Sequence, residues 1–96
     1  MSEDKEDLVG LSQEGYAAIR RGNLNEAETL FERILAEDST NSYALVGLGD
    51  VARRRRSFAD AVGYYQRCLD ADGENSFALF GLAESYRALR QFQRAI

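Results

Sequence analysis

The 96-residue sequence contains no proline, histidine or tryptophan, and Cys68 is its one cysteine. A lone cysteine excludes an internal disulfide, which is typical of a reducing compartment. Without histidine or a cysteine pair, the usual spacings of metal ligands are absent. The sequence also contains no glycine-rich phosphate loop between a strand and a helix. We therefore predict no metal, no cofactor and no enzymatic activity, and we interpret Cys68 as a buried hydrophobic residue.

Long hydrophobic runs are also absent. No apolar stretch approaches the roughly 20 residues that a membrane-spanning helix needs. The first residues after Met1, Ser2-Glu3-Asp4-Lys5-Glu6-Asp7, are acidic and polar, unlike a signal peptide. The net charge is −4, so the chain lacks the broad basic surface that is typical of a nucleic-acid-binding protein. We expect a cytoplasmic protein that neither inserts into membranes nor binds nucleic acid.

The sequence is rich in helix-forming residues, and it repeats with a period of 34 residues. The stretch Ser42–Asn75 aligns with Leu8–Asn41, and its first part aligns with Ser76–Ile96. Apolar, small and polar residues recur in phase; these columns are Leu11/Leu45/Leu79, Gly15/Gly49/Ala83, Leu24/Phe58/Phe92, Ala27/Ala61/Ala95, Phe31/Tyr65, Ile34/Cys68 and Asp7/Asn41/Asn75. A period of this length indicates a stacked array of structural repeats rather than a single globule. Asp and Asn before an apolar run are typical helix N-caps.

These columns resemble the tetratricopeptide repeat, whose 34-residue pattern places Leu-Gly, Tyr, Ala and an aromatic at fixed offsets. The best copy is Leu45, Leu48-Gly49, Ala52, Ala61, Tyr65, Cys68 and Gly73. Glu14 departs from the expected leucine, and Ser39 and Gly73 stand where the family has proline. The resemblance implies an all-α fold: an α-solenoid of antiparallel helix pairs with about two and a half repeats.

The pattern divides the chain into an acidic, disordered segment over residues 1–7, repeats over 8–41 and 42–75, and a truncated repeat over 76–96. It predicts helices over about residues 6–21, 24–38, 42–55, 57–72 and 76–89. A sixth helix is expected to open at Phe92. Gly22 is expected to end the first helix, and Asn23 with Glu26 has the form of a capping box.

In the family that this chain resembles, the first helix of each pair lines a concave groove. The resemblance assigns to this groove Tyr16, Arg20, Tyr43, Val46, Asp50, Arg53, Arg54, Phe77, Phe80, Glu84 and Arg87, together with Val9, Ser12, Ile19 and Ala88. Exposed aromatics with an arginine rim are typical of protein-binding hot spots. We therefore predict a protein–protein interaction module that binds a peptide or helix of a partner in an aromatic-rich groove. The alternative is that these aromatics pack as additional core.

Two narrower functions find less support. Family members that bind acidic C-terminal tails use a clamp of Lys, Arg and Asn, but the matching positions here are Ser12, Tyr16, Gly47, Phe77 and Gly81. The run Arg53–Arg56 could form a basic patch. However, successive helical residues point in different directions, and cations at a helix C-terminus complement its dipole.

The fifth helix lacks a complete partner, so Leu79, Leu82, Tyr86 and Leu89 should be partly uncovered. Two interpretations remain open: the chain is a fragment of a longer repeat array, or it forms a homo-oligomer through these C-terminal helices. The alternative function is accordingly a self-associating assembly scaffold.

Overall fold

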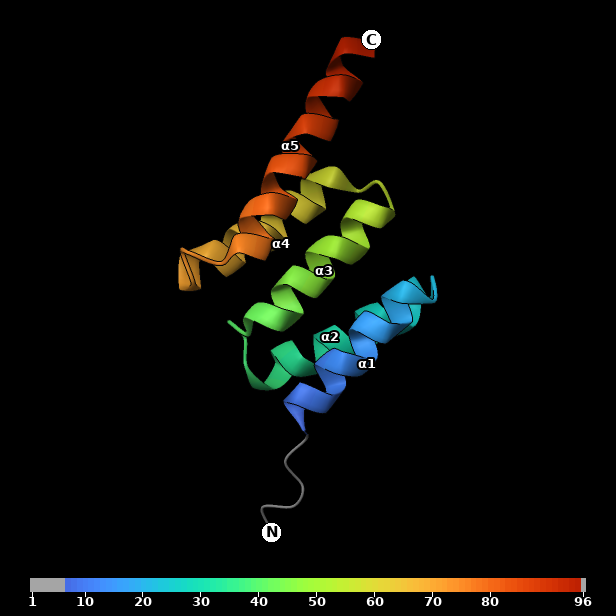
Figure 1. The fold of residues 1–96 in the computed structure, drawn as a ribbon, viewed down its shortest axis with the longest axis vertical. Helices are drawn as coiled ribbons and strands as arrows, with labels where there is room; N and C mark the ends of the chain where they lie inside the picture. The colour runs from blue at the N-terminus through green and yellow to red at the C-terminus, as the bar shows by residue number, and fades with distance from the viewer. Residues whose placement is uncertain (1–6, 96) are drawn as a thin grey trace.

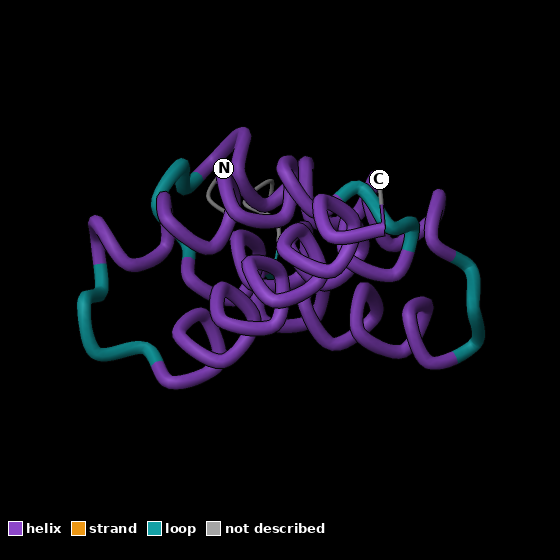
Figure 2. The backbone as a smooth tube through the Cα atoms, turned by 90° about the horizontal axis from the view of Figure 1, so that it is seen from above, coloured by secondary structure: helices purple, strands orange, loops and turns teal. Residues whose placement is uncertain are grey.

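The computed structural model describes the backbone of residues 7–95 and the side chains up to Gln91. This part of the chain forms five α-helices: α1 (Leu8–Arg20), α2 (Leu24–Glu37), α3 (Ser42–Arg54), α4 (Phe58–Ala71) and α5 (Ser76–Ala95). In Figure 1, α1, α3 and α5 run side by side nearer the viewer, and α2 and α4 lie behind them. Short loops join the helices at the two sides of the molecule (Figure 2). The predicted all-α solenoid of about two and a half repeats is confirmed.

We call α1, α3 and α5 the leading helices, and a polar residue caps the start of each. The side chain of Asp7 accepts a hydrogen bond from the Gly10 backbone N–H at 3.1 Å. Asn41 does the same for Ala44 at 3.0 Å, and Asn75 for Ala78 at 2.9 Å. Each bond satisfies an otherwise unpaired N–H of the first helical turn. The N-cap column predicted from the sequence is confirmed, whereas residues 1–6 of the predicted disordered segment lie outside the described residues.

The turn within each helix pair has one backbone geometry in both complete repeats. Gly22 has φ of 80° and Arg56 has φ of 63°. The N–H of Asn23 bonds to Ala18 O at 2.8 Å, and the N–H of Ser57 bonds to Ala52 O at 2.8 Å. These six-to-one bonds, each with a left-handed residue, are Schellman motifs.

The predicted capping box of Asn23 and Glu26 is wrong. The side chain of Asn23 makes no cap hydrogen bond to the helix backbone. Its Nδ2 instead donates to Glu26 Oε1 at 2.8 Å. The physical reason is that the backbone N–H of Asn23, which Glu26 was expected to satisfy, already bonds to Ala18 O in the Schellman motif.

The predicted sixth helix is also not formed. α5 continues without a turn from Ser76 to Ala95 and so includes the residues at which a new helix was expected. The position equivalent to Gly22 and Arg56 is Arg90, which lies inside α5. Arginine favours helix and disfavours the left-handed conformation, and within the described residues no following helix packs onto α5 to offset that preference. The side chains of Phe92 and Ala95, which belong to two of the predicted columns, lie outside the described residues.

Within the core, one aromatic residue of each second helix packs onto glycines of the first helices. Phe31 and Tyr65 are both fully buried. Phe31 packs against Gly15 of α1 and Gly47 of α3, and Tyr65 packs against Gly49 of α3 and Gly81 of α5. A Cβ atom at any of these four glycines would lie under 3.0 Å from the ring. The glycines therefore let neighbouring pairs stack closely while one aromatic fills the space between two leading helices.

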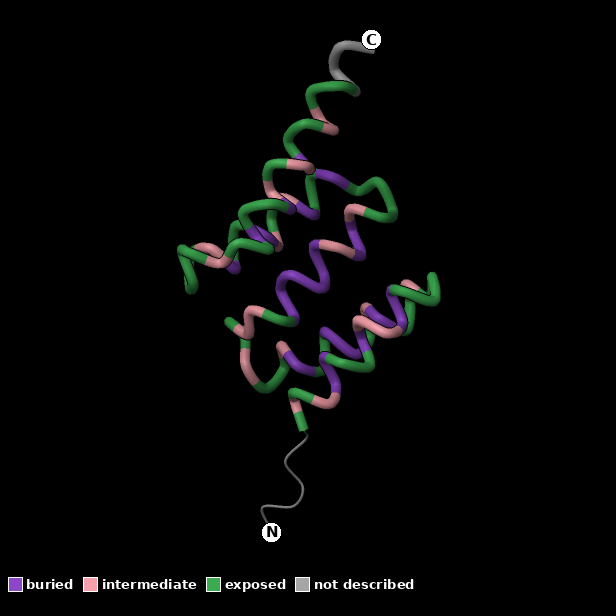
Figure 3. The backbone as a smooth tube through the Cα atoms, viewed as in Figure 1, coloured by how far each residue is buried: buried purple, intermediate pink, exposed green. Residues whose placement is uncertain are grey.

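Burial is greatest at α3, the central helix of the array. Both α2 and α4 pack against it, and α1 and α5 flank it on the open side. The buried trace in Figure 3 accordingly runs along most of α3 and fades toward the C-terminal half of α5. The open face of α3 and its two neighbours is the surface that carries the candidate site.

Candidate functional site

The open face of α1, α3 and α5 displays three large aromatic side chains. Tyr43 is 65% exposed, Phe77 75% and Phe80 61%. The alternative interpretation of these aromatics as additional core is therefore wrong for this chain. Such exposure is uncommon for large apolar side chains that have gathered on one face.

A hollow of about 630 Å³ lies beside these aromatics, near the starts of α3 and α5. Its lining includes five of the predicted groove residues: Tyr16, Tyr43, Val46, Asp50 and Phe77. Ser42, Asp72 and Asn75 complete it. We call this space the aromatic hollow. It combines side chains of α1, α3 and α5 because the stacking of the leading helices places them side by side.

Tyr16 forms the wall of the aromatic hollow on the α1 side. Its hydroxyl donates a hydrogen bond to the backbone carbonyl of Tyr43 at 2.6 Å. Its ring meets the Phe31 ring edge to face, with centroids 5.0 Å apart. Burial raises the pKa of the Tyr16 hydroxyl, and the Asp50 carboxylate raises it further, so the hydroxyl stays protonated and donating. Tyr16 therefore links α1 to α3, and its ring is held in place at the side of the aromatic hollow.

Asp50 lies at one end of the aromatic hollow in a small hydrogen-bond network. Its Oδ1 accepts from the Tyr65 hydroxyl at 2.5 Å and from Arg53 at 3.4 Å. Arg53 Nε also donates to the Tyr65 hydroxyl oxygen at 3.1 Å. Burial raises the pKa of the Tyr65 hydroxyl, and the hydrogen bond to Asp50 raises it further. Burial lowers the pKa of Arg53, but its bonds to Tyr65 and Asp50 outweigh this effect.

A second, shallower hollow of about 280 Å³ lies toward the ends of α3 and α5. Its lining includes the predicted groove residues Arg53, Glu84 and Arg87. Arg87 forms an ion pair with Glu84 one turn away. The Arg53 guanidinium lies 6.0 Å from the centre of the Phe80 ring.

The structure does not gather every predicted groove residue. Arg20, Arg54 and Phe80 are exposed but line neither of these two hollows. Ser12 and Ile19, which were also assigned to the groove, are 6% and 5% exposed and belong to the core side of α1. Val46 is itself only 7% exposed, so it contributes to the floor of the aromatic hollow.

Tyr65 is the site residue that the sequence did not predict. It belongs to α4, and its ring fills the core, yet its hydroxyl reaches the network of Asp50 and Arg53 on the open face. One signal could have found it: the equivalent residue of the first repeat is Phe31, which has no hydroxyl to satisfy. A buried tyrosine in a core column requires a hydrogen-bond partner nearby.

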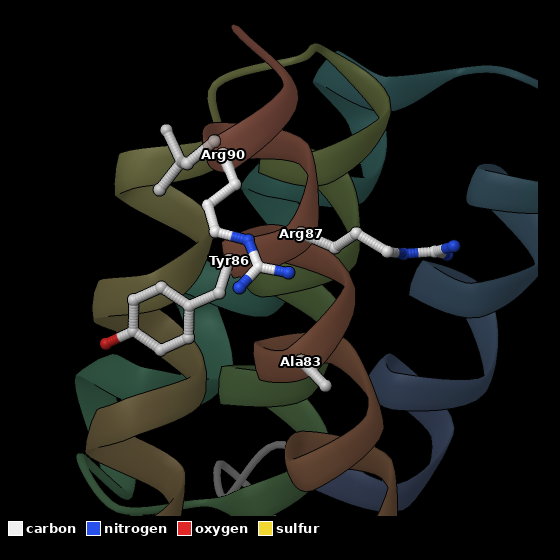
Figure 4. Close-up of a pocket in the computed structure, with 5 residues that line it drawn as sticks. Ala83, Tyr86, Arg87 and Arg90 are labelled. Carbon is white, nitrogen blue, oxygen red and sulfur yellow. The ribbon is translucent and has the colours of Figure 1, made fainter. Parts of the chain in front are cut away.

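The outer face of α5, on its other side, is uncovered. Leu79 is 49% exposed and Tyr86 53%, as the incomplete third repeat predicted. A shallow hollow of about 680 Å³ lies along this face, lined by Ala83, Tyr86, Arg87, Leu89 and Arg90. Figure 4 shows Tyr86 and Arg90 on one side of α5, with Arg87 directed away from them. In the complete repeats, α2 and α4 cover the equivalent faces of α1 and α3.

The side chains with metal-binding or nucleophilic chemistry are scattered or buried among the described residues. Within residues 7–91, no group of three or more His, Cys, Asp or Glu side chains is placed to hold a metal ion. Cys68 is fully buried, and burial raises the pKa of its thiol, as expected of an unreactive core residue. No helix in the described part of the chain is long and apolar enough to cross a membrane.

Stacked antiparallel helix pairs with one open face define an α-solenoid, a class of protein whose exposed faces serve mainly as binding surfaces. A family model described as the tetratricopeptide repeat matches residues 12–76, which is more than half of the chain. The chain belongs to the tetratricopeptide repeat family, whose repeats generally mediate protein–protein interaction. The comparison with curated proteins finds no match.

Proposed function

We propose that this chain is a protein–protein interaction module that binds a peptide or helix of a partner on the open face of α1, α3 and α5. The observation that carries the proposal is the exposure of Tyr43, Phe77 and Phe80 on one continuous face beside the aromatic hollow. Aromatic side chains present large apolar area at little cost in conformational entropy. They are also among the residues that dominate measured hot spots.

The polar residues of this face would orient the partner. Asp50 and Arg53 are held by bonds to Tyr65, so their positions are fixed before a ligand arrives. Fixed polar groups at the edge of an apolar surface add specificity, because a partner must pair with them or leave them desolvated. Tyr16 is likewise tied to α3.

The test is selection of a displayed library of random peptides on the immobilised chain. We expect peptides with apolar anchors to be enriched. The variant Tyr43→Ala/Phe77→Ala/Phe80→Ala should weaken their binding by more than about thirtyfold, because a single hot-spot truncation already costs about 2 kcal/mol. Far-UV circular dichroism should be unchanged, since all three side chains are largely exposed.

The matched control is Leu79→Ala/Tyr86→Ala, which removes similarly exposed apolar side chains from the outer face of α5. This variant should bind the selected peptides as the original chain does. Equal loss in both variants, or no loss in the triple variant, would contradict the proposal.

A second candidate function is self-association through the outer face of α5. The observation that favours it is the partial exposure of Leu79 and Tyr86 along a helix face that a second helix covers in both complete repeats. Burying such a face against another copy removes apolar surface from water.

A further inference from the structure

The charged hydrogen-bonding groups that line the aromatic hollow are acceptors, since the lining includes two carboxylates. The Tyr16 hydroxyl already donates to the Tyr43 carbonyl. The Asn75 side chain is engaged at both ends: Nδ2 donates to Asp72 Oδ2 at 3.2 Å, and Oδ1 accepts from the Ala78 N–H. The bonds that Asp50 accepts from Tyr65 and Arg53 both reach Oδ1. The second oxygens of Asp50 and Asp72 are therefore the strongest acceptors left for a ligand.

The formal charges of the lining residues have one sign. Asp50 and Asp72 are the charged members of the lining, which includes neither lysine nor arginine. Arg53 offsets part of the Asp50 charge, but its guanidinium lies over Phe80 and lines the second hollow. Asp72 is exposed, and its partner Asn75 is neutral.

The aromatic side chains that line the hollow also favour a positively charged ligand. Tyr16, Tyr43 and Phe77 line the aromatic hollow, and the faces of aromatic rings attract cations and repel anions. The starts of α3 and α5 act in the opposite sense, with about half a positive charge each. That effect falls off within the first turn, and the side chains of Asn41 and Asn75 already occupy donors there. The hollow therefore suits a group that is positively charged and donates hydrogen bonds.

We propose that the aromatic hollow binds the basic side chain, arginine or lysine, of a partner segment whose flanking residues are apolar. The basic group enters between Tyr43 and Phe77 and donates to the carboxylates of Asp50 and Asp72. The neighbouring apolar residues pack on the exposed ring of Phe80. This inference rests on the proposed function, because it names the chemistry of the partner that the open face binds.

The same peptide selection tests the inference separately from the proposed function. We expect the enriched peptides to carry Arg or Lys beside apolar residues, and their binding to weaken as salt is raised. Asp72→Asn should weaken these peptides about fivefold and Asp50→Asn about tenfold, as expected for the loss of an exposed and a partly buried charge pair. Replacing the basic residue of a selected peptide by norleucine should abolish the difference between the variants and the original chain.

Two controls test whether the effect depends on the position of the carboxylate and whether it arises from misfolding. Glu32→Gln removes an exposed carboxylate of α2, outside the open face of α1, α3 and α5, and it should leave the binding of the basic peptides unchanged. Asp72→Asn provides the readout if Asp50→Asn perturbs folding through Tyr65, because Asp72 is exposed and hydrogen-bonds to a neighbouring turn residue.

The outcomes separate the two claims. Enriched peptides that bind through Tyr43, Phe77 and Phe80 but are neutral or acidic would overturn the inference and leave the proposed function standing. Equal binding of basic peptides by Asp72→Asn, Asp50→Asn and the original chain would also overturn the inference. If no peptide depends on the three aromatics, the proposed function fails, and the inference fails with it.

Discussion

Arg56 ends the α3 helix in a backbone conformation that most residues avoid. Its φ is 63°, whereas the equivalent turn of the first repeat uses Gly22 with φ of 80°. For a residue with a side chain, the left-handed region costs roughly 1–2 kcal/mol. The turn nevertheless forms, because its Schellman hydrogen bonds and the packing of α4 onto α3 stabilise it.

We predict that Arg56→Gly stabilises the fold by about 1 kcal/mol relative to Arg56→Ala. Both substitutions remove the contact between the Arg56 guanidinium and the Phe58 ring, so the comparison isolates the backbone term. Urea denaturation of the two variants measures the difference. In the reverse direction, Gly22→Ala should lower the free energy of unfolding by a similar amount. Equal stability of Arg56→Gly and Arg56→Ala would contradict the assignment of strain to this residue.

The repeat pattern indicated which side chains share a helix face, but it did not predict the hydrogen-bond partners of their polar atoms. The column that Phe31 shares with Tyr65 is aromatic, and both rings lie in the core. It could not show that the Tyr65 hydroxyl reaches Asp50, because a column reports the face of a helix and not the length of a side chain. The same limit applies to Tyr16, whose bond to the Tyr43 carbonyl depends on the distance between two helices.

At the scale of elements, a glycine within a helix stabilises or destabilises the fold according to the side chains that it contacts. Gly49 lies on α3 against the Tyr65 ring, where an added Cβ would lie 2.5 Å from Cε1. Gly63 lies on the exposed side of α4, where an added Cβ meets nothing within 4 Å. The first glycine permits two helix pairs to stack, whereas the second only weakens its own helix.

This contrast predicts stability changes of opposite sign for one chemical change. Gly49→Ala should destabilise the fold by about 1–3 kcal/mol, because the helices must separate to admit the methyl group. Gly63→Ala should stabilise it by about 0.5–1 kcal/mol, because alanine is the better helix former. Thermal unfolding followed by circular dichroism measures both. A loss of stability on Gly63→Ala, or no change on Gly49→Ala, would show that the packing described for these helices is wrong.

The starts of helices were predictable because they depend on local chemistry. Asp7, Asn41 and Asn75 cap the helices that follow them, as the sequence indicated. The end of α5 was not predictable in the same way. At Gly22 and Arg56 the turn is followed by a second helix that packs on the first, whereas the described residues include no such helix after Arg90. Tertiary packing therefore contributes to the outcome beside the local sequence.

At the scale of the whole molecule, the array has two apolar surfaces with different origins. The open face of α1, α3 and α5 is repeated in each unit, so its exposure follows from the curvature of the solenoid. The outer face of α5 is exposed because nothing within the described chain covers it. The resemblance to the family predicted the open face, and the incomplete third repeat predicted the uncovered face of α5. The sequence could not rank the two surfaces, since ranking requires the exposed fractions of individual side chains.

We predict that the outer face of α5 drives self-association and that the open face does not. Sedimentation velocity over a range of protein concentrations should give a sedimentation coefficient that rises with concentration. Leu79→Ser/Tyr86→Ser should abolish this rise, because it replaces the two most exposed apolar side chains of that face with polar ones. Phe77→Ser/Phe80→Ser is the matched control on the same helix, and it should associate as the original chain does.

The results of this comparison assign a role to each surface. Association that is lost only in Phe77→Ser/Phe80→Ser would mean that the open face binds another copy, which would replace the proposed peptide partner with the chain itself. A constant sedimentation coefficient at every concentration would exclude the scaffold function for this chain and leave the open face as the binding surface. Retention of the rise in both variants would place the contact elsewhere and contradict the assignment to α5, since Leu79 and Tyr86 are its most exposed apolar side chains outside the open face.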